Sequence, residues 1–490
     1  MDKISRILTV AVLALFALVF GLALLLGGAQ PEHLSYCVAF ALGVMAVGGY
    51  TLIQRRPRPT PSVWERLGSR KTALLLLGFC FLFNLAWVLF FRLEPAGDFA
   101  VYWRAALDLA AGRTPSNRSY LALFPSILGY SSFLSLSLRL FGTGPYVIPV
   151  LNVCLTTLSG FFLYRLALRW RGPNSAALVL LCWSIFPSKL FYNAMVLPEP
   201  YYTCLLLAAL WLAAETEARR PKPVTAALLG LAAGLLLRLV GMARPVAAVA
   251  ALIALLIWTL LLRTGSGKES RGTWIGFLTL LLAACLLTGP LWSAYAERTL
   301  GEEPAAFSGY SLYAGLNPDS LGAYSREDMA HLKQLRRQEG SAISAQSRIL
   351  EEAKERLHSG TVPFGALFVN KLRSFLGCDE GGAFLSRAGL RDRAYQLLAL
   401  GSNVWYYAVG MLALWGTWRL YRSGERRTVL LLPLYILGQT LPQLFTEVAA
   451  RCHYPILPML ILLAAFSYTR PVKPNEPAPA DGGKGASHAG

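Results

Sequence analysis

Charged side chains are scarce in this sequence of 490 residues. They make up 15% of the chain, whereas hydrophobic residues make up 55% and the mean hydropathy is +0.47. The core of a water-soluble protein of this length needs less apolar content than that. The composition therefore excludes an ordinary soluble globular protein and indicates an all-α polytopic membrane protein.

Several familiar catalytic and metal-binding patterns are absent. The chain has no GxxxxGKS/T or GxGxxG loop for a soluble nucleotide, and no HExxH or GxSxG segment of a zinc protease or an α/β-hydrolase. Its eight cysteines show no CxxC spacing and lie mostly inside apolar runs, so we interpret them as small core residues. No cofactor is predicted, because no DxD pattern supports a divalent metal.

Acidic residues are fewer than basic ones, and the formal net charge is +19. The basic residues stand in short clusters between apolar runs, which is typical of the cytoplasmic loops of membrane proteins. We therefore attribute the charge to membrane orientation and predict no nucleic-acid partner. The clusters assigned to the cytoplasm are 54–71, 165–172, 217–222, 262–271 and 421–427.

Many apolar runs are long enough to cross a bilayer. Residues 7–28 exceed the roughly 20 residues that a spanning helix needs and are too long for the apolar part of a signal peptide. The runs together predict a bundle of about 12 to 13 transmembrane helices. Residues 119–142 conflict with the parity of the charge-derived topology and contain Ser, Pro and Gly, so we expect a re-entrant or tilted element there.

Hydropathy and charge divide the chain into five regions. They are residues 1–71, with two N-terminal helices and a basic cytoplasmic loop; 72–293, a transmembrane core with a first outer loop at 92–120; 294–395, an extracytoplasmic loop with amphipathic helices; 396–470, the last transmembrane helices; and 471–490, a Pro/Gly/Ala-rich cytoplasmic tail predicted to be disordered.

The large outer loop contains helical patterns of its own. Apolar residues recur at helical spacing over 327–357, which predicts an amphipathic helix lying on the bilayer. Residues 363–377 form a short run that carries Lys371 and Arg373, so we expect it to be interfacial rather than spanning. Lys371 then either contributes to a site on the outer face or reaches ordinary lipid phosphates.

Asp98 follows the apolar run 72–91 on the face predicted to lie outside. One interpretation is structural, because an Asp before an apolar-periodic segment is a good helix N-cap. The other is functional: a carboxylate at the membrane surface can be a general base or a metal ligand, beside aromatic rings such as Tyr102 that face a sugar or a headgroup. Glu94 is a weaker candidate because it can simply mark the water boundary.

Glu199 stands between Pro198 and Pro200 at the outer end of a run that returns inward. An acid this close to hydrocarbon is costly unless it is solvated or paired, which makes it a functional candidate. The alternative is an acid that only begins a helix. Arg238, inside another apolar run, is a buried cation for which the sequence indicates no partner.

Positive groups are predicted on the same outer side. Arg244 lies between two apolar runs, and Arg451 and His453 share the turn between the last two helices with Glu447. Arginine suits bidentate recognition of phosphate, so these residues predict a site for a phosphate-linked lipid. The alternative for Arg451 is a local ion pair with Glu447 four residues away.

Five segments taken in order resemble the GT-C superfamily of membrane glycosyltransferases. The nearest pattern is that of family 39-like proteins, similar to protein mannosyltransferases and aminoarabinose transferases. The resemblance extends from about residue 90 onward. The segments are FRLEPAGDFAVYW, VLPEPYYTCLLLAALWL, MARPVAAV, GLNPDSLGAY and EVAARCHYPILPMLILLAA.

The resemblance implies a GT-C-like bundle and a role for each matching residue. Asp98 would be the catalytic base that activates an acceptor hydroxyl, and Glu199 would occupy a second acidic position where many relatives carry Asp. Arg244 and Arg451 would hold the phosphate of a polyprenyl-phosphate sugar donor. The acceptor would be a glycan, lipid or protein of the cell envelope, on the extracytoplasmic face of a bacterial plasma membrane. The chain departs from the family in having three helices before the Asp98 loop where one is usual.

Two other functions fit part of the pattern. A flippase or transporter of lipid-linked glycans would also use Arg and acidic residues inside a helical bundle, but along the depth of a central cavity. Here the assignable charges cluster at one face, with Arg238 the exception, which favours the enzyme. An envelope polymerase or ligase with the same lipid donors would differ only in its substrate.

Overall fold

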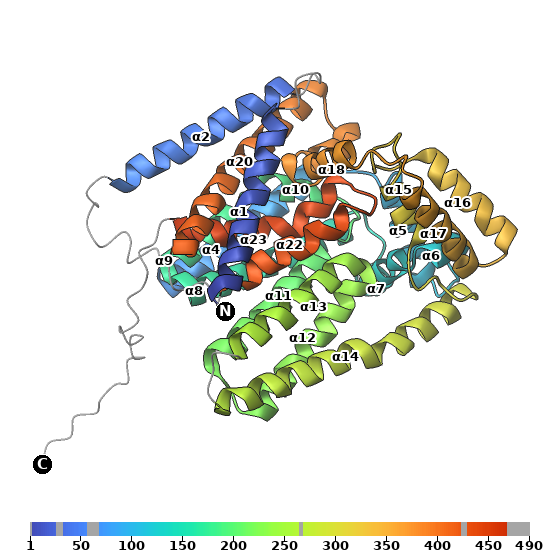
Figure 1. Cartoon of the computed structure of the whole chain (residues 1–490), viewed down its shortest axis with the longest axis horizontal. Coiled ribbons are helices and arrows are strands. Elements are labelled where there is room, and N and C mark those ends of the chain that lie inside the picture. Colours follow the sequence, from blue (N-terminus) through green and yellow to red (C-terminus); the bar gives the residue numbers. More distant parts are fainter. Residues whose placement is uncertain (1, 26–32, 56–67, 264–267, 423–428, 468–490) are drawn as a thin grey trace, which may run out of the picture.

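The regular structure of this protein is helical throughout the part of the chain that the computed structural model describes, residues 2–25, 33–55, 68–263, 268–422 and 429–467 (Figure 1). The helices are α1 (Asp2–Leu25), α2 (His33–Arg55), α4 (Arg70–Phe90), α5 (Asp98–Ala110), α6 (Arg118–Leu123), α7 (Pro125–Phe141), α8 (Val147–Arg171), α9 (Pro173–Ser184), α10 (Pro187–Asn193), α11 (Glu199–Arg219), α12 (Pro223–Ala243), α13 (Pro245–Arg263), α14 (Lys268–Leu300), α15 (Gly309–Gly315), α16 (Arg326–Glu339), α17 (Ala342–His358), α18 (Phe364–Leu372), α19 (Gly381–Leu385), α20 (Asp392–Arg422), α22 (Leu431–Gln443) and α23 (Leu457–Ala464). Short helical turns complete the set: η1 (Arg373–Gly377), η2 (Arg387–Gly389), η3 (Ala450–Ile456) and η4 (Ala465–Ser467).

Nine helices among the described residues are long and apolar enough to cross a membrane. They are α1, α2, α4, α8, α12, α13, α14, α20 and the continuous segment from η3 to η4. The prediction of an all-helical, multi-pass membrane protein is confirmed. The number rises to ten if α9 and α10, which meet at 56°, form one bent span.

The count of about 12 to 13 spans expected from the sequence is therefore higher than the nine or ten of the described chain. The difference lies in apolar runs that form shorter or more polar helices. Helix α7 has 17 residues, α22 has 13, and α11 carries carboxylates near both ends. Residues 119–142, where we expect a re-entrant or tilted element, are divided between α6, which ends at Leu123, and α7, which begins at Pro125. The orientation of this element stays a prediction.

Small residues bring α12 and α14 into direct backbone contact. A Cβ atom on Gly230 would lie 2.0 Å from the carbonyl oxygen of Phe277, and one on Gly234 would lie 2.4 Å from that of Leu281. Glycines at this spacing let transmembrane helices approach closely enough for their backbones to touch. This contact fixes α12, whose C-terminal end leads directly into Arg244.

A buried polar network holds the break between α9 and α10. The Nζ atom of Lys189 donates to Asn84 Oδ1 at 2.5 Å and to the carbonyl of Ser184 at 3.1 Å. Asn193 donates to the same Asn84 oxygen at 2.8 Å. A broken helix at membrane depth leaves backbone groups that need protein partners, and Lys189 supplies one for the end of α9. The network thereby fixes the chain just before α11 and Glu199.

The polar helices α5, α6, α15, α16 and α17 gather at one end of the bundle (Figure 1). The stretch 327–357, expected as one helix on the bilayer, is two helices. Gly340, with φ of 71°, ends α16, and the Ser341 side chain accepts from the backbone N–H of Ser344 to begin α17. Their apolar residues, including Leu332 and Ile349, are buried in a core shared with α5, α6 and α15. The amphipathic faces thus pack on protein.

The other regional predictions stay predictions. The run 363–377 is split between α18 and η1 and is not among the candidate spans, in line with an interfacial segment. Much of the predicted cytoplasmic loop, at 56–67, and the whole tail 471–490 lie outside the described residues.

We predict that Gly230→Ala lowers the thermal unfolding temperature in detergent, because the new methyl group would push α14 away from α12. Gly78→Ala on α4 is the matched control, since a Cβ atom there has no neighbour within 4 Å. That control should be neutral or slightly stabilising, as Ala is the better helix former. Equal unfolding temperatures for the two variants would contradict close contact between α12 and α14.

Candidate functional site

A cavity of about 480 Å³ opens at the end of the bundle where the polar helices gather. Its walls come from α5, the α6–α7 turn, the α12–α13 turn, α15, α22 and the segment that follows α22. A space of this size accommodates a sugar or a headgroup of similar bulk. Its walls include a set of charged, amide and tyrosine side chains: Asp98, Tyr102, Tyr120, Tyr202, Arg244, Tyr310, Tyr324, Gln439, Gln443, Glu447 and Arg451.

Asp98 is the first residue of α5 and faces this cavity. The preceding Gly97 has φ of 54°, which favours glycine, and it is Gly97 that occupies the N-cap position. The interpretation of Asp98 as the N-cap is therefore wrong. Its Oδ2 atom instead accepts a hydrogen bond from Nη2 of Arg451 at 3.0 Å, while 63% of the side chain stays exposed. A carboxylate with an open side remains accessible to a ligand.

Arg451 reaches Asp98 across 353 positions of sequence. It lies on η3, which extends from the last turn of the chain into α23. The local ion pair with Glu447, considered from the sequence, is not formed in the described part of the chain. The long-range pair is the one that the fold makes: η3 packs against α11, and the Arg451 side chain reaches Asp98 at the start of α5.

Arg244 ends α12 and immediately precedes Pro245, the first residue of α13. Its Nη2 atom donates to Oε1 of Glu199 at 2.6 Å. Glu199 is fully buried in the first turn of α11, where a carboxylate is favoured by the helix dipole. A buried carboxylate needs a charged partner, and Arg244 supplies it.

Glu199 itself does not line the cavity, so the pair positions Arg244 rather than offering two charges to a ligand. The other carboxylate oxygen of Glu199, Oε2, is buried without a hydrogen-bond partner. Tyr102 lies on the cavity wall, and its ring packs edge-on against Tyr130 with ring centroids 5.4 Å apart. Glu94 and Arg238 are not among the lining residues, and the Nε atom of Arg238 is buried without a partner.

Lys371 and His453, both expected to bind lipid phosphate, do not line the cavity. Lys371 is buried, and its Nζ atom donates to the carbonyl of Thr446 at 2.5 Å and to that of Gln443 at 3.4 Å. Burial lowers the pKa of Lys371 to about 8. The contacts hold the segment that leads to Glu447, so Lys371 neither snorkels to lipid nor faces a ligand in this structure.

His453, which lies on η3 two residues after Arg451, contacts a buried carboxylate outside the cavity. Its Nε2 atom lies 2.8 Å from Oδ1 of Asp379, and both side chains are buried. Burial raises the pKa of Asp379, an effect that the contact with His453 partly offsets. This pair anchors the turn that carries Arg451 and therefore positions the guanidinium rather than contacting the cavity.

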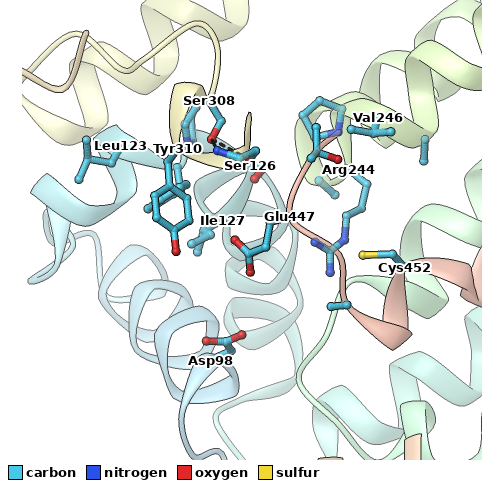
Figure 2. A pocket seen from close by; sticks show the side chains of 18 of the residues that line it. Asp98, Leu123, Ser126, Ile127, Arg244, Val246, Ser308, Tyr310, Glu447 and Cys452 are labelled. Carbon is cyan, nitrogen blue, oxygen red and sulfur yellow. Dashed lines mark hydrogen bonds between the residues drawn. The ribbon is translucent and has the colours of Figure 1, made fainter. Parts of the chain in front are cut away.

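Glu447, which the sequence indicates only as a partner for Arg451, is a further functional candidate. Figure 2 shows its carboxylate and that of Asp98 directed, with the Arg244 guanidinium, into the same space. Burial raises the pKa of Glu447, an effect that Arg451 opposes and Asp98 reinforces. Gln439 and Gln443 precede it on the same wall, and their spacing of four residues is a signal that the sequence contained.

Metal binding has little support in this arrangement. No group of three or more His, Cys, Asp or Glu side chains that could hold a metal ion occurs among residues whose positions are described. The two cavity carboxylates face two arginines instead, which is an arrangement suited to an anionic ligand.

Comparison with known proteins shows a distant structural similarity. No protein-family model and no curated protein matches the chain. Among solved structures, it is similar to ArnT from Cupriavidus metallidurans bound to undecaprenyl phosphate, with 13% sequence identity and a TM-score of 0.30. The match covers 84% of this chain and 78% of that one.

We predict that Arg244→Met lowers the free energy of unfolding by about 3–5 kcal/mol, because it leaves the buried Glu199 carboxylate unpaired. The double variant Glu199→Gln/Arg244→Met should recover most of that loss, since it removes the orphaned charge. Reversible unfolding in detergent micelles measures both. Additive losses in the double variant would show that the two side chains do not stabilise each other.

Proposed function

We propose that this chain is a GT-C type glycosyltransferase that transfers a sugar from a polyprenyl-phosphate donor to an acceptor of the cell envelope. The acceptor is a glycan, a lipid or a protein, and the reaction takes place on the extracytoplasmic face. One observation carries the proposal: Asp98, Arg244 and Arg451 come from distant segments and meet at one cavity at the end of a membrane bundle. The order of motifs in the sequence points to the same reaction class.

The arginines suit the phosphate of such a donor. A lipid phosphate is already a leaving group, and transfer accelerates when the charge that develops on it meets fixed positive groups. Arg244 is held by Glu199, and Arg451 is held by the turn that His453 anchors, so both guanidinium groups are in position before a ligand arrives. Pre-positioned charge of this kind lowers the cost of reorganisation during the reaction.

Asp98 is suited to the role of general base. A phosphate that binds Arg451 competes for the guanidinium with Asp98, and the released carboxylate can accept the proton of the acceptor hydroxyl. The hydroxyl oxygen then bonds to the anomeric carbon while the bond from that carbon to the phosphate oxygen breaks. The electron pair of that bond leaves with the lipid phosphate, and the proton stays on Asp98, so charge and atoms balance.

A flippase of lipid-linked glycans is less well supported. Such a protein needs polar groups along the depth of a path through the bundle. The arginines and carboxylates described here border a single cavity, whose walls include residues of the polar helices α5, α6, α15 and α16. Turnover of a lipid-linked sugar by the purified chain separates the two functions, because a flippase returns its substrate unchanged.

We predict that Asp98→Asn reduces sugar transfer about 100-fold or more, because it removes the base, while binding of undecaprenyl phosphate persists. The control is Asp108→Asn on the same helix, whose carboxylate contacts Arg113 and the backbone of Ser116 and does not line the cavity. Mass spectrometry of surface glycans, with and without the intact gene, identifies the sugar and the acceptor to be assayed. Undiminished turnover by Asp98→Asn removes the catalytic assignment.

We also predict that Arg451→Met weakens the binding of undecaprenyl phosphate about tenfold or more, because a charge-assisted hydrogen bond to the phosphate is lost. Arg104→Met is the matched control, since Arg104 is exposed on α5 and is not part of the cavity wall. Binding is measured with the full chain in nanodiscs. Equal affinities for the two variants would restrict Arg451 to a structural role.

A further inference from the structure

One wall of the cavity is lined by polar groups that have no partner in the structure. Gln439 and Gln443 lie one helical turn apart on α22 and are 4% and 5% exposed. The Oε1 atom of each is buried and makes no hydrogen bond. Buried polar atoms are nearly always paired in folded proteins, so two unpaired amide oxygens on one cavity wall require an explanation.

The same wall continues beyond the end of α22. Glu447 follows Gln443 by four residues, also lines the cavity, and forms no ion pair with the described residues. Lys371 holds the intervening segment through the carbonyls of Gln443 and Thr446. Gln439, Gln443 and Glu447 thus form a fixed row, which we call the glutamine wall.

The chemistry of the glutamine wall differs from that of the rest of the cavity. Amides donate and accept hydrogen bonds, and a carboxylate accepts them, which together suits neutral hydroxyl groups. The wall is a poor site for phosphate, because the Glu447 carboxylate would repel it. The arginines that suit phosphate lie on other parts of the cavity wall, where Arg244 contacts Glu199 and Arg451 contacts Asp98.

The donor sugar and the acceptor would occupy different parts of the cavity. The anomeric carbon must lie within reach of the phosphate and of the acceptor oxygen at once, so the sugar must occupy the space bordered by the arginines and Asp98. The Asp98 side chain is largely exposed, which leaves an open side for the acceptor. The glutamines are buried, which leaves the closed side for the sugar.

We propose that the glutamine wall is the specificity site for the donor: Gln439, Gln443 and Glu447 bind the hydroxyl groups of a neutral sugar carried on the polyprenyl phosphate. This inference rests on the proposed function and names a part of its substrate. None of the three residues touches the reacting atoms in this scheme, so they determine which donor binds rather than the chemistry of transfer.

The experiment compares affinities for lipids with and without a sugar. The full chain in nanodiscs is titrated with undecaprenyl phosphate and with undecaprenyl phosphate carrying glucose, mannose, galactose or arabinose. We expect at least one sugar-bearing lipid to bind the wild type about tenfold more tightly than the sugar-free lipid. In Gln439→Met/Gln443→Met most of this difference in affinity should be lost, because only Glu447 of the three sugar-binding residues remains, while the affinity for undecaprenyl phosphate itself is unchanged.

The unfolding temperature provides a second measurement, which distinguishes ligand-binding glutamines from glutamines that only stabilise the fold. The double methionine variant removes unpaired buried amides, so the unfolding temperature of the ligand-free protein should stay the same or rise. Gln346→Met is the control. Gln346 is also buried, but its amide accepts from the backbone of Tyr310 and donates to the carbonyl of Leu123, so its loss should lower the unfolding temperature.

The outcomes separate this inference from the proposed function. If the wild type binds undecaprenyl phosphate but no sugar in the panel adds affinity, or if the double variant keeps the wild-type difference, the glutamine wall is not a sugar site and the function stands. If the wild type binds none of these lipids, the proposed function fails and the inference fails with it. A drop in unfolding temperature for the double variant comparable to that of Gln346→Met also overturns the inference.

Discussion

A carboxylate buried at the edge of a membrane bundle is stable only with a positive partner, and here that constraint ties together three helices. Glu199 begins α11, and Arg244 joins α12 to α13. Their hydrogen bond fixes where these helices end relative to one another, and it does so around a carboxylate that is fully buried. The cost of an unpaired charge in that setting is large, so the geometry of the Arg244 guanidinium is set by the fold and not by a ligand.

The position of the second guanidinium, that of Arg451, is determined by different contacts. Arg451 lies on a short turn anchored from behind by His453 and Asp379, and its own partner is the exposed carboxylate of Asp98. An ion pair with an open side gives little stability, since solvent screens it. It is therefore the contact that a phosphate can most readily replace. The cavity combines one arginine that is firmly held with one whose partner can be displaced, which fits the proposed reaction, in which a lipid phosphate binds and a base is released.

Interruptions of helices produce this arrangement. Proline follows Arg244 directly, and the network around Lys189 supports the break between α9 and α10, which comes shortly before Glu199 in the chain. Each interruption leaves polar backbone that must be satisfied within the protein, and each turns a side chain toward the same end of the bundle. By contrast, the glycine contact of α12 with α14 lies within uninterrupted helices and serves to hold them in register.

The sequence by itself determined the all-helical membrane fold, because apolar length and helical periodicity are local properties. It also indicated Asp98, Arg244 and Arg451 as candidates, since charges at the ends of apolar runs are conspicuous against so little polar background, and all three line the cavity. Only the tertiary structure decided which charges meet. The pairing of Arg451 with Asp98 instead of its neighbour Glu447, and the withdrawal of Lys371 from the cavity into contacts with backbone carbonyls, depend on how distant helices pack. Hydropathy is a property of neighbouring residues in the sequence. Contact between two residues that are 353 positions apart depends on how all the helices pack together.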